Sequence, residues 1–245
     1  MLIVERGLAE SREKAQAMIL AGEVRVNGER SEKAGAQIAE DARIEAGGTT
    51  SKYASRGGWK LDGALEDFGI DATGKICLDI GASTGGFTDC LLQHGARRIY
   101  AVDVTPQQMA WRLQQDARVT RIKANARSLR PEQIPEPAGL VTVDVSFIAV
   151  AKVLPAVVAA AGPCAEYLIL VKPQFELDRD DIGPGGIVRD SALQERATDR
   201  VRQATLAAGL RVEGVRPSRI KGAEGNQEFF LYARNIIPAV HRNPG

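Results

Sequence analysis

Asp-Ile-Gly-Ala-Ser-Thr-Gly-Gly-Phe, residues 79–87, is the most informative segment of this 245-residue chain. It continues an apolar run at 76–80, which is typical of a buried strand, and it directly precedes a predicted helix at 88–94. Glycines allow a backbone to approach a ligand closely, and the first turn of a helix presents unbonded N–H groups. The segment therefore predicts a ligand site at one edge of an α/β sheet.

An acidic residue further along the chain supports the same site. Asp103 lies 24 residues beyond Asp79, directly after the apolar run 99–102. A carboxylate there can accept hydrogen bonds from both hydroxyl groups of a ribose, which indicates a nucleoside-containing cofactor. The spacing Asp-x-Gly-x-x-x-Gly lacks the Gly-x-Gly-x-x-Gly of a dinucleotide site, and it resembles the pattern of S-adenosylmethionine-dependent methyltransferases more closely than that of NAD enzymes. A glycine-rich turn that binds nothing is the alternative interpretation.

Strand and helix patterns alternate from residue 55 onward. Helices are predicted from Ser55, where Leu61, Leu65 and Phe68 become buried, and from Ser191 to Gly209, where Gln194 completes a capping box. The remaining predicted elements are strands at 76–80, 98–104, 140–146, 167–171 and 228–232, with helices at 88–94 and 107–115. This alternation predicts an α/β fold, with a mostly parallel sheet covered on both faces.

The first fifty residues have a different pattern. Ser11 is placed to cap a helix that Gly22 ends, and Asn27-Gly28 follows alternating valines as in a tight hairpin. With a short strand near Ile44, this predicts a small α+β module. Residues 47–51 have the composition of a linker. We therefore expect two domains, at 1–50 and 51–245.

Four charged residues occupy positions that are unusual for a solvated surface. Asp144 and Lys172 end apolar strands, Lys60 follows the start of a helix, and Glu228 opens the last strand. The carboxyl ends of parallel strands form the edge at which α/β proteins bind ligands, and an antiparallel last strand would begin at that edge. The pattern predicts that the four groups converge beside the cofactor. Taken singly, each is also compatible with an ordinary structural or surface role.

Composition excludes several classes of protein. Lys and Arg total 32 and Asp and Glu total 31, so the formal charge of +1 excludes a polybasic nucleic-acid coat. Cys77, Cys90 and Cys164 are widely spaced, which argues against a disulfide framework or a structural zinc site. No apolar run reaches the ~20 residues that span a bilayer. We expect a soluble protein of the cytoplasm that does not bind membranes.

Five motifs in order give the chain a resemblance to a known family. They are Ser55–Leu61, Asp79–Phe87, Asp144–Phe147, Val171–Glu176 and Gly225–Glu228. Together they resemble the TlyA (haemolysin-A-like) ribosomal RNA 2′-O-ribose methyltransferases. That family combines an FtsJ-type methyltransferase domain with an N-terminal alpha-L RNA-binding module. The resemblance covers nearly the whole chain and implies a Rossmann-like class I methyltransferase fold with an antiparallel last strand.

The resemblance also implies site residues and a cofactor. The family's catalytic Lys-Asp-Lys-Glu tetrad maps onto Lys60, Asp144, Lys172 and Glu228, and no metal is implied. S-adenosyl-L-methionine is the implied cofactor, and its predicted contacts are Asp79, Gly81, Ala82, Ser83, Gly85, Gly86, Phe87, Asp103 and Asn125. The implied reaction is 2′-O-methylation of a cytidine in ribosomal RNA, on a flipped nucleotide, with ribosomal RNA or ribosomal subunits as the partner.

RNA binding is expected to involve the first domain. Residues 1–45 hold seven Lys or Arg and nine acids, so any RNA-binding face must concentrate the cations, and Arg12 and Lys33 are the candidates. A second basic cluster, Arg121, Lys123, Arg127 and Arg130, is a further candidate, and solvated surface charge is the alternative for both. The first helix is expected to be shorter than in the family, which would lower RNA affinity. A noncatalytic RNA-binding or ribosome-assembly factor and a membrane-active haemolysin are the competing functions.

Overall fold

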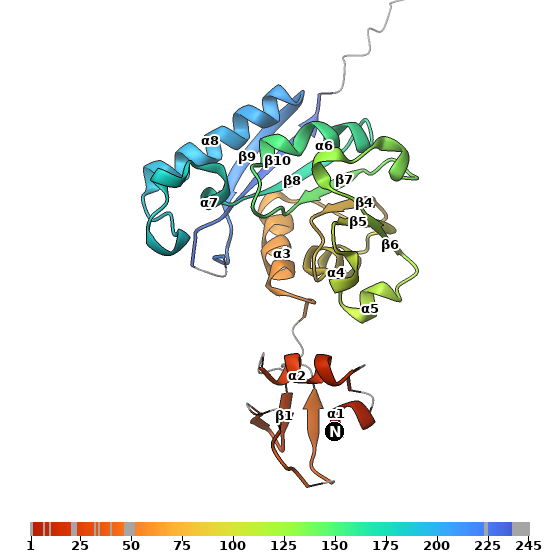
Figure 1. Cartoon of the computed structure of the whole chain (residues 1–245). Coiled ribbons are helices and arrows are strands. Elements are labelled where there is room, and N and C mark those ends of the chain that lie inside the picture. The colour runs from red at the N-terminus through yellow and green to blue at the C-terminus, as the bar shows by residue number, and fades with distance from the viewer. Residues whose placement is uncertain are drawn as a thin grey trace, which may run out of the picture. The chain divides into compact units, whose positions relative to one another are not determined.

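The structure is a computed structural model with two compact units, which divide between Lys52 and Tyr53 (Figure 1). It describes residues 2–6, 8–9, 11–20, 24–31, 33, 35–39, 41–46, 52–222 and 225–236. The expected boundary after residue 50 lies two residues before the observed division.

The first unit contains two helices and a small antiparallel sheet. The helices are α1 (Leu2–Glu5) and α2 (Arg12–Leu20), and the sheet has the order β2-β1-β3 with β1 (Val24–Val26), β2 (Glu29–Arg30) and β3 (Ile44–Ala46). Asn27 and Gly28 have φ of +53° and +87°, the left-handed values that a tight hairpin needs, and the Oγ of Ser11 accepts the N–H of Lys14. The predicted hairpin and helix cap are therefore confirmed. Gly22 and residues 47–51 lie outside the described residues.

The second unit is built on a seven-stranded sheet with the order β6-β5-β4-β7-β8-β10-β9. The first five strands in this order are parallel, and β10 runs antiparallel between β8 and β9, as predicted for the last strand. The strand bounds are β4 (Ile76–Ile80), β5 (Arg98–Asp103), β6 (Val119–Lys123), β7 (Leu140–Val143), β8 (Glu166–Val171), β9 (Leu210–Pro217) and β10 (Phe229–Asn235).

Helices cover both faces of this sheet (Figure 1). On one face α3 (Arg56–Phe68), α4 (Gly86–Gln93) and α5 (Trp111–Gln114) bury Leu61, Leu91 and Leu113 in a common apolar core. On the other face α6 (Leu154–Ala160) and α8 (Ser191–Ala207) bury Leu154 and Val201, and α7 (Pro173–Glu176) packs against α8. Short 3-10 helices lie at Pro106–Gln108, Ala126–Ser128, Pro131–Gln133, Val150–Lys152, Arg179–Asp181 and Pro184–Gly186.

Several predicted elements are wrong in detail. The helix expected at 107–115 is split into a 3-10 turn and α5, because Ala110 between them adopts an extended backbone and donates its N–H to Thr84. The strand expected at 140–146 ends at Val143. Asp190 caps α8, whereas Gln194 donates to the carbonyl of Val188, so the predicted capping box is absent. Strands β6 and β9 were not predicted, since Val119–Lys123 and Leu210–Pro217 are only partly buried.

No helix among the described residues is long and apolar enough to cross a bilayer.

Candidate active site

Asp79, near the end of β4, helps to fix the glycine-rich turn that follows this strand. This residue is fully buried, and its two carboxylate oxygens accept hydrogen bonds from Thr88 at 2.6 Å and Thr142 at 2.9 Å. Burial raises the pKa of Asp79 to about 6, against the opposing effect of these hydrogen bonds. With both oxygens occupied, Asp79 braces β4, α4 and β7 together and does not reach the cavity described next.

A cavity of about 520 Å³ lies where β4, β5 and β7 end. Its lining includes five of the predicted site residues, namely Gly81, Ser83, Asp103, Asn125 and Asp144. Gly81 has a φ of +82°, and a Cβ at this position would lie 2.2 Å from the carbonyl oxygen of Asp144. A side chain at residue 81 would therefore push β4 and β7 apart at the floor of the cavity.

Asp103 is fixed at the wall of the cavity by backbone N–H groups. Its carboxylate accepts hydrogen bonds from Ser83 N–H at 2.9 Å and from Thr105 N–H at 2.8 Å. These bonds orient a partly exposed carboxylate toward the ligand space, which is the arrangement expected for a group that binds the hydroxyls of a ribose. Asn125 lies further along the same wall, and its side-chain oxygen accepts the N–H of Arg127.

The donor groups and shape of this cavity fit an adenosyl group. The polar side offers the Asp103 carboxylate and the backbone of the 81–83 turn, whereas Val104, Phe147 and Ile148 supply apolar surface. The cavity therefore offers one carboxylate for a ribose and apolar walls for an aromatic base.

The other predicted turn residues do not line the cavity. Ala82, Gly85, Gly86 and Phe87 are buried, and the Phe87 ring stacks on Phe230 at a centroid separation of 6.1 Å. Their predicted contact with the cofactor stays a prediction. In the structure they shape the turn and pack α4 against the sheet.

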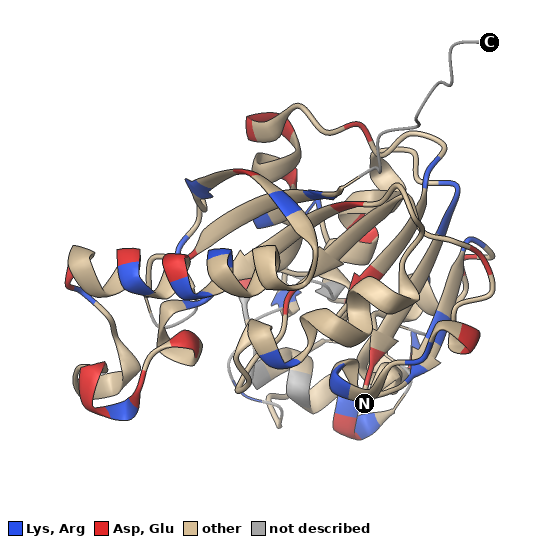
Figure 2. Cartoon of the chain, turned by 90° about the horizontal axis from the view of Figure 1, so that it is seen from above, with Lys and Arg blue, Asp and Glu red and all other residues tan. Residues whose placement is uncertain are grey.

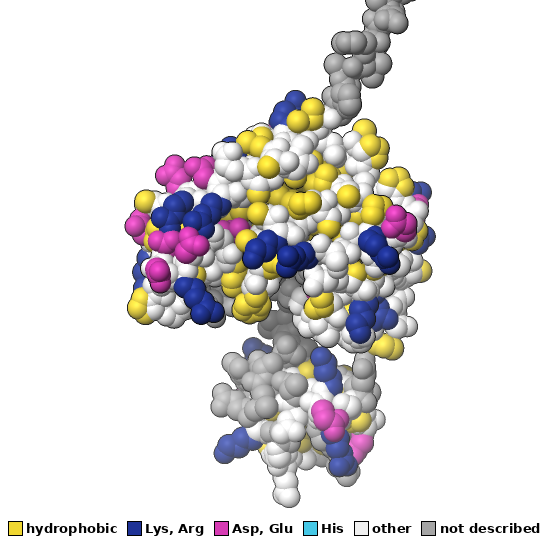
Figure 3. Space-filling model, turned by 45° about the horizontal axis from the view of Figure 1, so that its top comes forward, with side chains coloured by type: hydrophobic (Ala, Val, Ile, Leu, Met, Phe, Trp, Pro, Cys, Tyr) yellow, Lys and Arg dark blue, Asp and Glu magenta, His cyan; other side chains and the backbone are white. Residues whose placement is uncertain are grey.

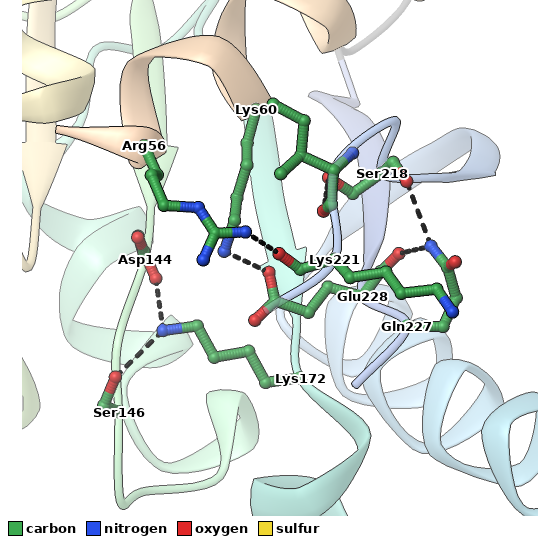
Figure 4. Close-up of polar contacts among 10 residues, drawn as sticks. Arg56, Lys60, Asp144, Ser146, Lys172, Ser218, Lys221, Gln227 and Glu228 are labelled. Carbon is green, nitrogen blue, oxygen red and sulfur yellow. Dashed lines mark hydrogen bonds and ion pairs between the residues drawn. The ribbon is translucent and has the colours of Figure 1, made fainter. Parts of the chain in front are cut away.

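The four predicted catalytic groups meet at the carboxyl edge of the sheet as two ion pairs (Figure 4). The Nζ of Lys172 lies 2.6 Å from the Oδ1 of Asp144 and donates to the Oγ of Ser146 at 2.9 Å. The Nζ of Lys60 lies 2.5 Å from the Oε2 of Glu228. Because Asp144 also lines the cavity at the ends of β4, β5 and β7, the first pair connects this cavity to the predicted tetrad.

Sheet register explains why these residues converge. Phe229 pairs with Val171 between antiparallel β10 and β8, so Glu228 and Lys172 leave the sheet at the same point. Val143 pairs with Ile169 on the other side of β8, which brings Asp144 to that edge. The side chains of Lys60 and Lys172 are each 11% exposed and that of Glu228 is 4% exposed, so these charges are largely shielded from solvent.

Several residues near this edge were missed by sequence reasoning. Ser146 binds Lys172, and the guanidinium of Arg56 donates to the carbonyl of Lys221 beside the Lys60–Glu228 pair (Figure 4). Gly222 lies so close to Glu228 that a Cβ would come within 2.6 Å of its carboxylate. Arg56 and Ser146 lie within the motifs Ser55–Leu61 and Asp144–Phe147, and this position could have drawn attention to them. No sequence pattern distinguishes Lys221 or Gly222.

Phe147 is the most unusual of the missed residues. It is 90% exposed, its φ is +63°, and its ring lies 5.1 Å from that of Phe175. A bulky side chain rarely adopts this left-handed conformation, and an aromatic ring is rarely so exposed. Phe147 lines the same cavity, which indicates a role in contact with a ligand.

The predicted RNA-binding cations are all exposed. Arg12 and Lys33 lie at the surface of the first unit, and Arg121, Lys123, Arg127 and Arg130 lie at the surface of the second. Acidic residues are interspersed with cations along the ribbon and on the face seen in the space-filling view (Figures 2 and 3). Any RNA-binding surface is therefore a local group of cations.

Asp62, Cys90 and His94 form a cluster that sequence spacing did not reveal. Their potential ligand atoms lie within 4.8 Å of one another, between α3 and α4. The Nε2 of His94 lies 2.7 Å from Asp62, which is a hydrogen-bonding distance and shorter than the usual separation of two ligands around one zinc ion. The cluster is explained as a polar link between the two helices.

Comparison with known proteins agrees with this geometry. The model of the FtsJ-like methyltransferase family matches residues 53–235, and that of the S4 domain matches residues 1–44. The chain is 43% identical to the 16S/23S rRNA (cytidine-2'-O)-methyltransferase TlyA of Mycobacterium tuberculosis, over 98% of this chain and 94% of that protein. It is 42% identical to Hemolysin A of Brachyspira hyodysenteriae, over 92% of this chain and 95% of that protein.

Solved structures show the same fold. A candidate hemolysin from Streptococcus thermophilus has a TM-score of 0.75 and 39% identity, over 97% of this chain and 90% of that one. Aeropyrum pernix fibrillarin with bound S-adenosyl-L-methionine has a TM-score of 0.53 and 17% identity, over 80% of each chain, which supports the class I fold alone. The predicted enzyme class and S-adenosylmethionine cofactor are confirmed by the family match, and the chain belongs to the FtsJ-like methyltransferase family, in the TlyA and hemolysin A group that carries an N-terminal S4 domain.

Proposed function

We propose that this protein methylates the 2′-hydroxyl of a cytidine ribose in ribosomal RNA. The observation that carries the proposal is the position of Asp144, which lines the cofactor cavity and lies 2.6 Å from the ammonium of Lys172. A reacting hydroxyl held by Lys172 would therefore lie beside the mouth of the cofactor cavity. Cytidine and ribosomal RNA are inferred from the names of the TlyA relatives.

The cofactor supplies the electrophile, a methyl group on a positively charged sulfur. Asp103, Gly81, Ser83 and Asn125 are the residues that would hold it, through the carboxylate, the turn backbone and the amide. The remaining requirement is a nucleophile, because a ribose hydroxyl is a poor one at neutral pH.

Lys172 is placed to act on that hydroxyl. Its ammonium donates to the Oγ of Ser146 and forms an ion pair with Asp144, and an ammonium has three N–H donors in all, so it can also donate to a substrate oxygen. In its cationic form Lys172 would stabilise negative charge as it develops on the oxygen. The hydroxyl proton would then pass to water. The Lys60–Glu228 pair would orient the ribose from the other side.

Phe147 offers a surface for the base of the target nucleotide. Proteins commonly recognise unstacked RNA bases by stacking them on exposed aromatic rings. The ring of Phe147 is the aromatic ring in the lining of this cavity, and it packs against the ring of Phe175. A flipped nucleotide stacked there would have its ribose close to Lys172, since Lys172 also lies 5.9 Å from the Phe175 ring.

Methyl transfer to isolated ribosomal subunits tests the function. The protein is incubated with each subunit and S-adenosylmethionine that carries a labelled methyl group, and the modified nucleotide is mapped. We expect label on a ribose 2′-oxygen of a cytidine. Label on a base would contradict the reaction type, and tight RNA binding without transfer would favour the noncatalytic assembly factor. Leakage of liposomes at low protein concentration would favour the membrane-active alternative.

A further inference from the structure

Glu176 is a buried carboxyl that the proposed reaction does not use. It is the last residue of α7, the helix that directly follows Lys172, and it is 7% exposed. Its Oε1 accepts a hydrogen bond of 2.9 Å from the backbone N–H of Val150. Burial raises the pKa of Glu176 to about 7, and the Val150 N–H and Arg200 oppose this rise. An ionisable group is thus kept inside the protein at a cost in stability.

The hydrogen-bond partner of Glu176, Val150, directly follows a loop that contains several of the proposed site residues. Residues 144–149 connect β7 to the 3-10 helix Val150–Lys152, and they include Asp144, Ser146 and Phe147. The loop is fixed at its start, where the N–H of Asp144 donates to the carbonyl of Ile80 at 2.9 Å. Glu176 fixes its end through Val150.

Phe147 depends on such anchors. Its left-handed backbone is unfavourable for a side chain of this size, and its ring is 90% exposed, so little burial compensates for the strain. Inside the second unit its ring contact is with Phe175, which belongs to the same helix as Glu176. Helix α7 and the residue that precedes it therefore contact the loop at three points. Lys172 donates to Ser146, Phe175 packs against Phe147, and Glu176 accepts the N–H of Val150.

We propose that Glu176 is a positioning residue for the RNA substrate, which fixes the 144–149 loop so that Phe147 presents its ring beside Lys172. This inference rests on the proposed function. Glu176 acts through the loop and does not line the cofactor cavity. The competing explanation is a purely structural cap on the 3-10 helix, which would change stability and leave RNA kinetics unaltered.

Three variants separate these explanations. Glu176→Ala removes the acceptor, and Glu176→Gln keeps an oxygen of the same reach without the charge. Asp178→Ala is the matched control, because Asp178 lies two residues further on, pairs with Arg200 at 2.8 Å and has a side chain that is 74% exposed. The measurements are kcat and KM for RNA methylation, S-adenosylmethionine affinity by calorimetry, and the thermal unfolding midpoint.

We expect Glu176→Ala to lose at least ~10-fold in kcat/KM for RNA, while cofactor affinity changes by less than about 3-fold. Glu176→Gln and Asp178→Ala should each stay within about 3-fold of the parent, because both retain an acceptor for Val150. Parental kinetics in a folded Glu176→Ala protein would overturn the proposal. Loss of activity in Glu176→Gln as large as in Glu176→Ala would overturn it as well. If Glu176→Ala does not fold, Glu176→Leu preserves the side-chain volume, and the same outcomes apply.

A double-mutant cycle tests whether the effect passes through the loop. In a Phe147→Ala background, Glu176→Ala should lower kcat/KM by a further factor of less than about 3, because the ring that Glu176 positions is already absent. A full additional loss would overturn the proposal. Failure of the proposed function would appear differently, since the parent protein itself would then place no methyl group on a ribose 2′-oxygen.

Discussion

The ammonium of Lys172 lies 2.6 Å from the carboxylate of Asp144, across the ends of the neighbouring strands β8 and β7. This pair is the point at which the cavity beside Asp103 and the charged edge of the sheet meet, because Asp144 belongs to both. A second pair, Lys60 with Glu228, lies alongside it and is formed by residues from the two ends of the domain. The site is therefore completed only when the last strand joins the sheet.

Asp103→Ala should weaken binding of S-adenosylmethionine by about 1.5–3 kcal/mol, the range for a hydrogen bond to a charged group. The reason is that the Asp103 carboxylate is fixed by two backbone N–H groups at the cavity wall. Calorimetry measures the effect, with Asp199→Ala on α8 as an exposed control. Unchanged affinity would place the site elsewhere, and tighter binding of NAD than of S-adenosylmethionine would contradict the assigned cofactor.

Much of this site could be predicted because its residues interrupt strong local patterns. Asp144 and Lys172 are charges at the ends of apolar strands, and the 79–87 turn lies between a strand and a helix. The pairing of these charges could not be predicted, since Lys60 and Glu228 are 168 residues apart and meet through sheet register. Burial of Glu176 and the left-handed backbone of Phe147 depend on tertiary packing, which no local pattern reveals.

The same limit applies to the missed strands. In β6, Val119–Lys123, the sequence Val-Thr-Arg-Ile-Lys shows no regular alternation of apolar and polar residues, and only its place at the edge of the sheet makes it a strand. Asn27-Gly28 was predictable because the φ values that its turn requires are specific to a few residue types.

Charge reversal at Arg12 or Lys33 should make RNA binding less dependent on salt. Each cation that neutralises a phosphate releases a counterion, so its loss reduces the slope of log affinity against log salt by about one. Binding of the RNA substrate is measured between low and moderate salt for Arg12→Glu and Lys33→Glu, with Arg211→Glu on β9 as the control. Slopes equal to that of the parent would show that neither residue contacts a phosphate.

Glu176→Gln should make stability less dependent on pH. Folding raises the pKa of Glu176 from 4.5 to about 7, so this group stabilises the folded state fully below pH 4.5 and loses that contribution as the pH rises through 7. The parent should therefore lose on the order of 2–3 kcal/mol more than Glu176→Gln between pH 4.5 and 8. Urea unfolding at several pH values measures this difference. Parallel pH profiles for the two proteins would contradict the raised pKa.

Lys172→Ala should retain binding of cofactor and RNA and lose at least ~100-fold in turnover, the lower range for general acid–base and electrostatic assistance. Lys172→Arg discriminates between the two modes, because arginine keeps the positive charge and cannot give up its proton in a protein. With Asp144 only 2.6 Å from Nζ, we expect Lys172→Arg to keep more activity than Lys172→Ala, as stabilisation of a developing alkoxide requires.

The comparison is interpretable only if arginine does not displace the ribose, so RNA affinity is measured for both variants and must match the parent. With matched affinity, an arginine variant as inactive as the alanine variant would indicate proton abstraction by a neutral lysine. Parental turnover in Lys172→Ala would remove Lys172 from the reaction. The chemistry would then rest on positioning by Lys60, Glu228 and the cofactor cavity, because these are the remaining groups at the same edge of the sheet.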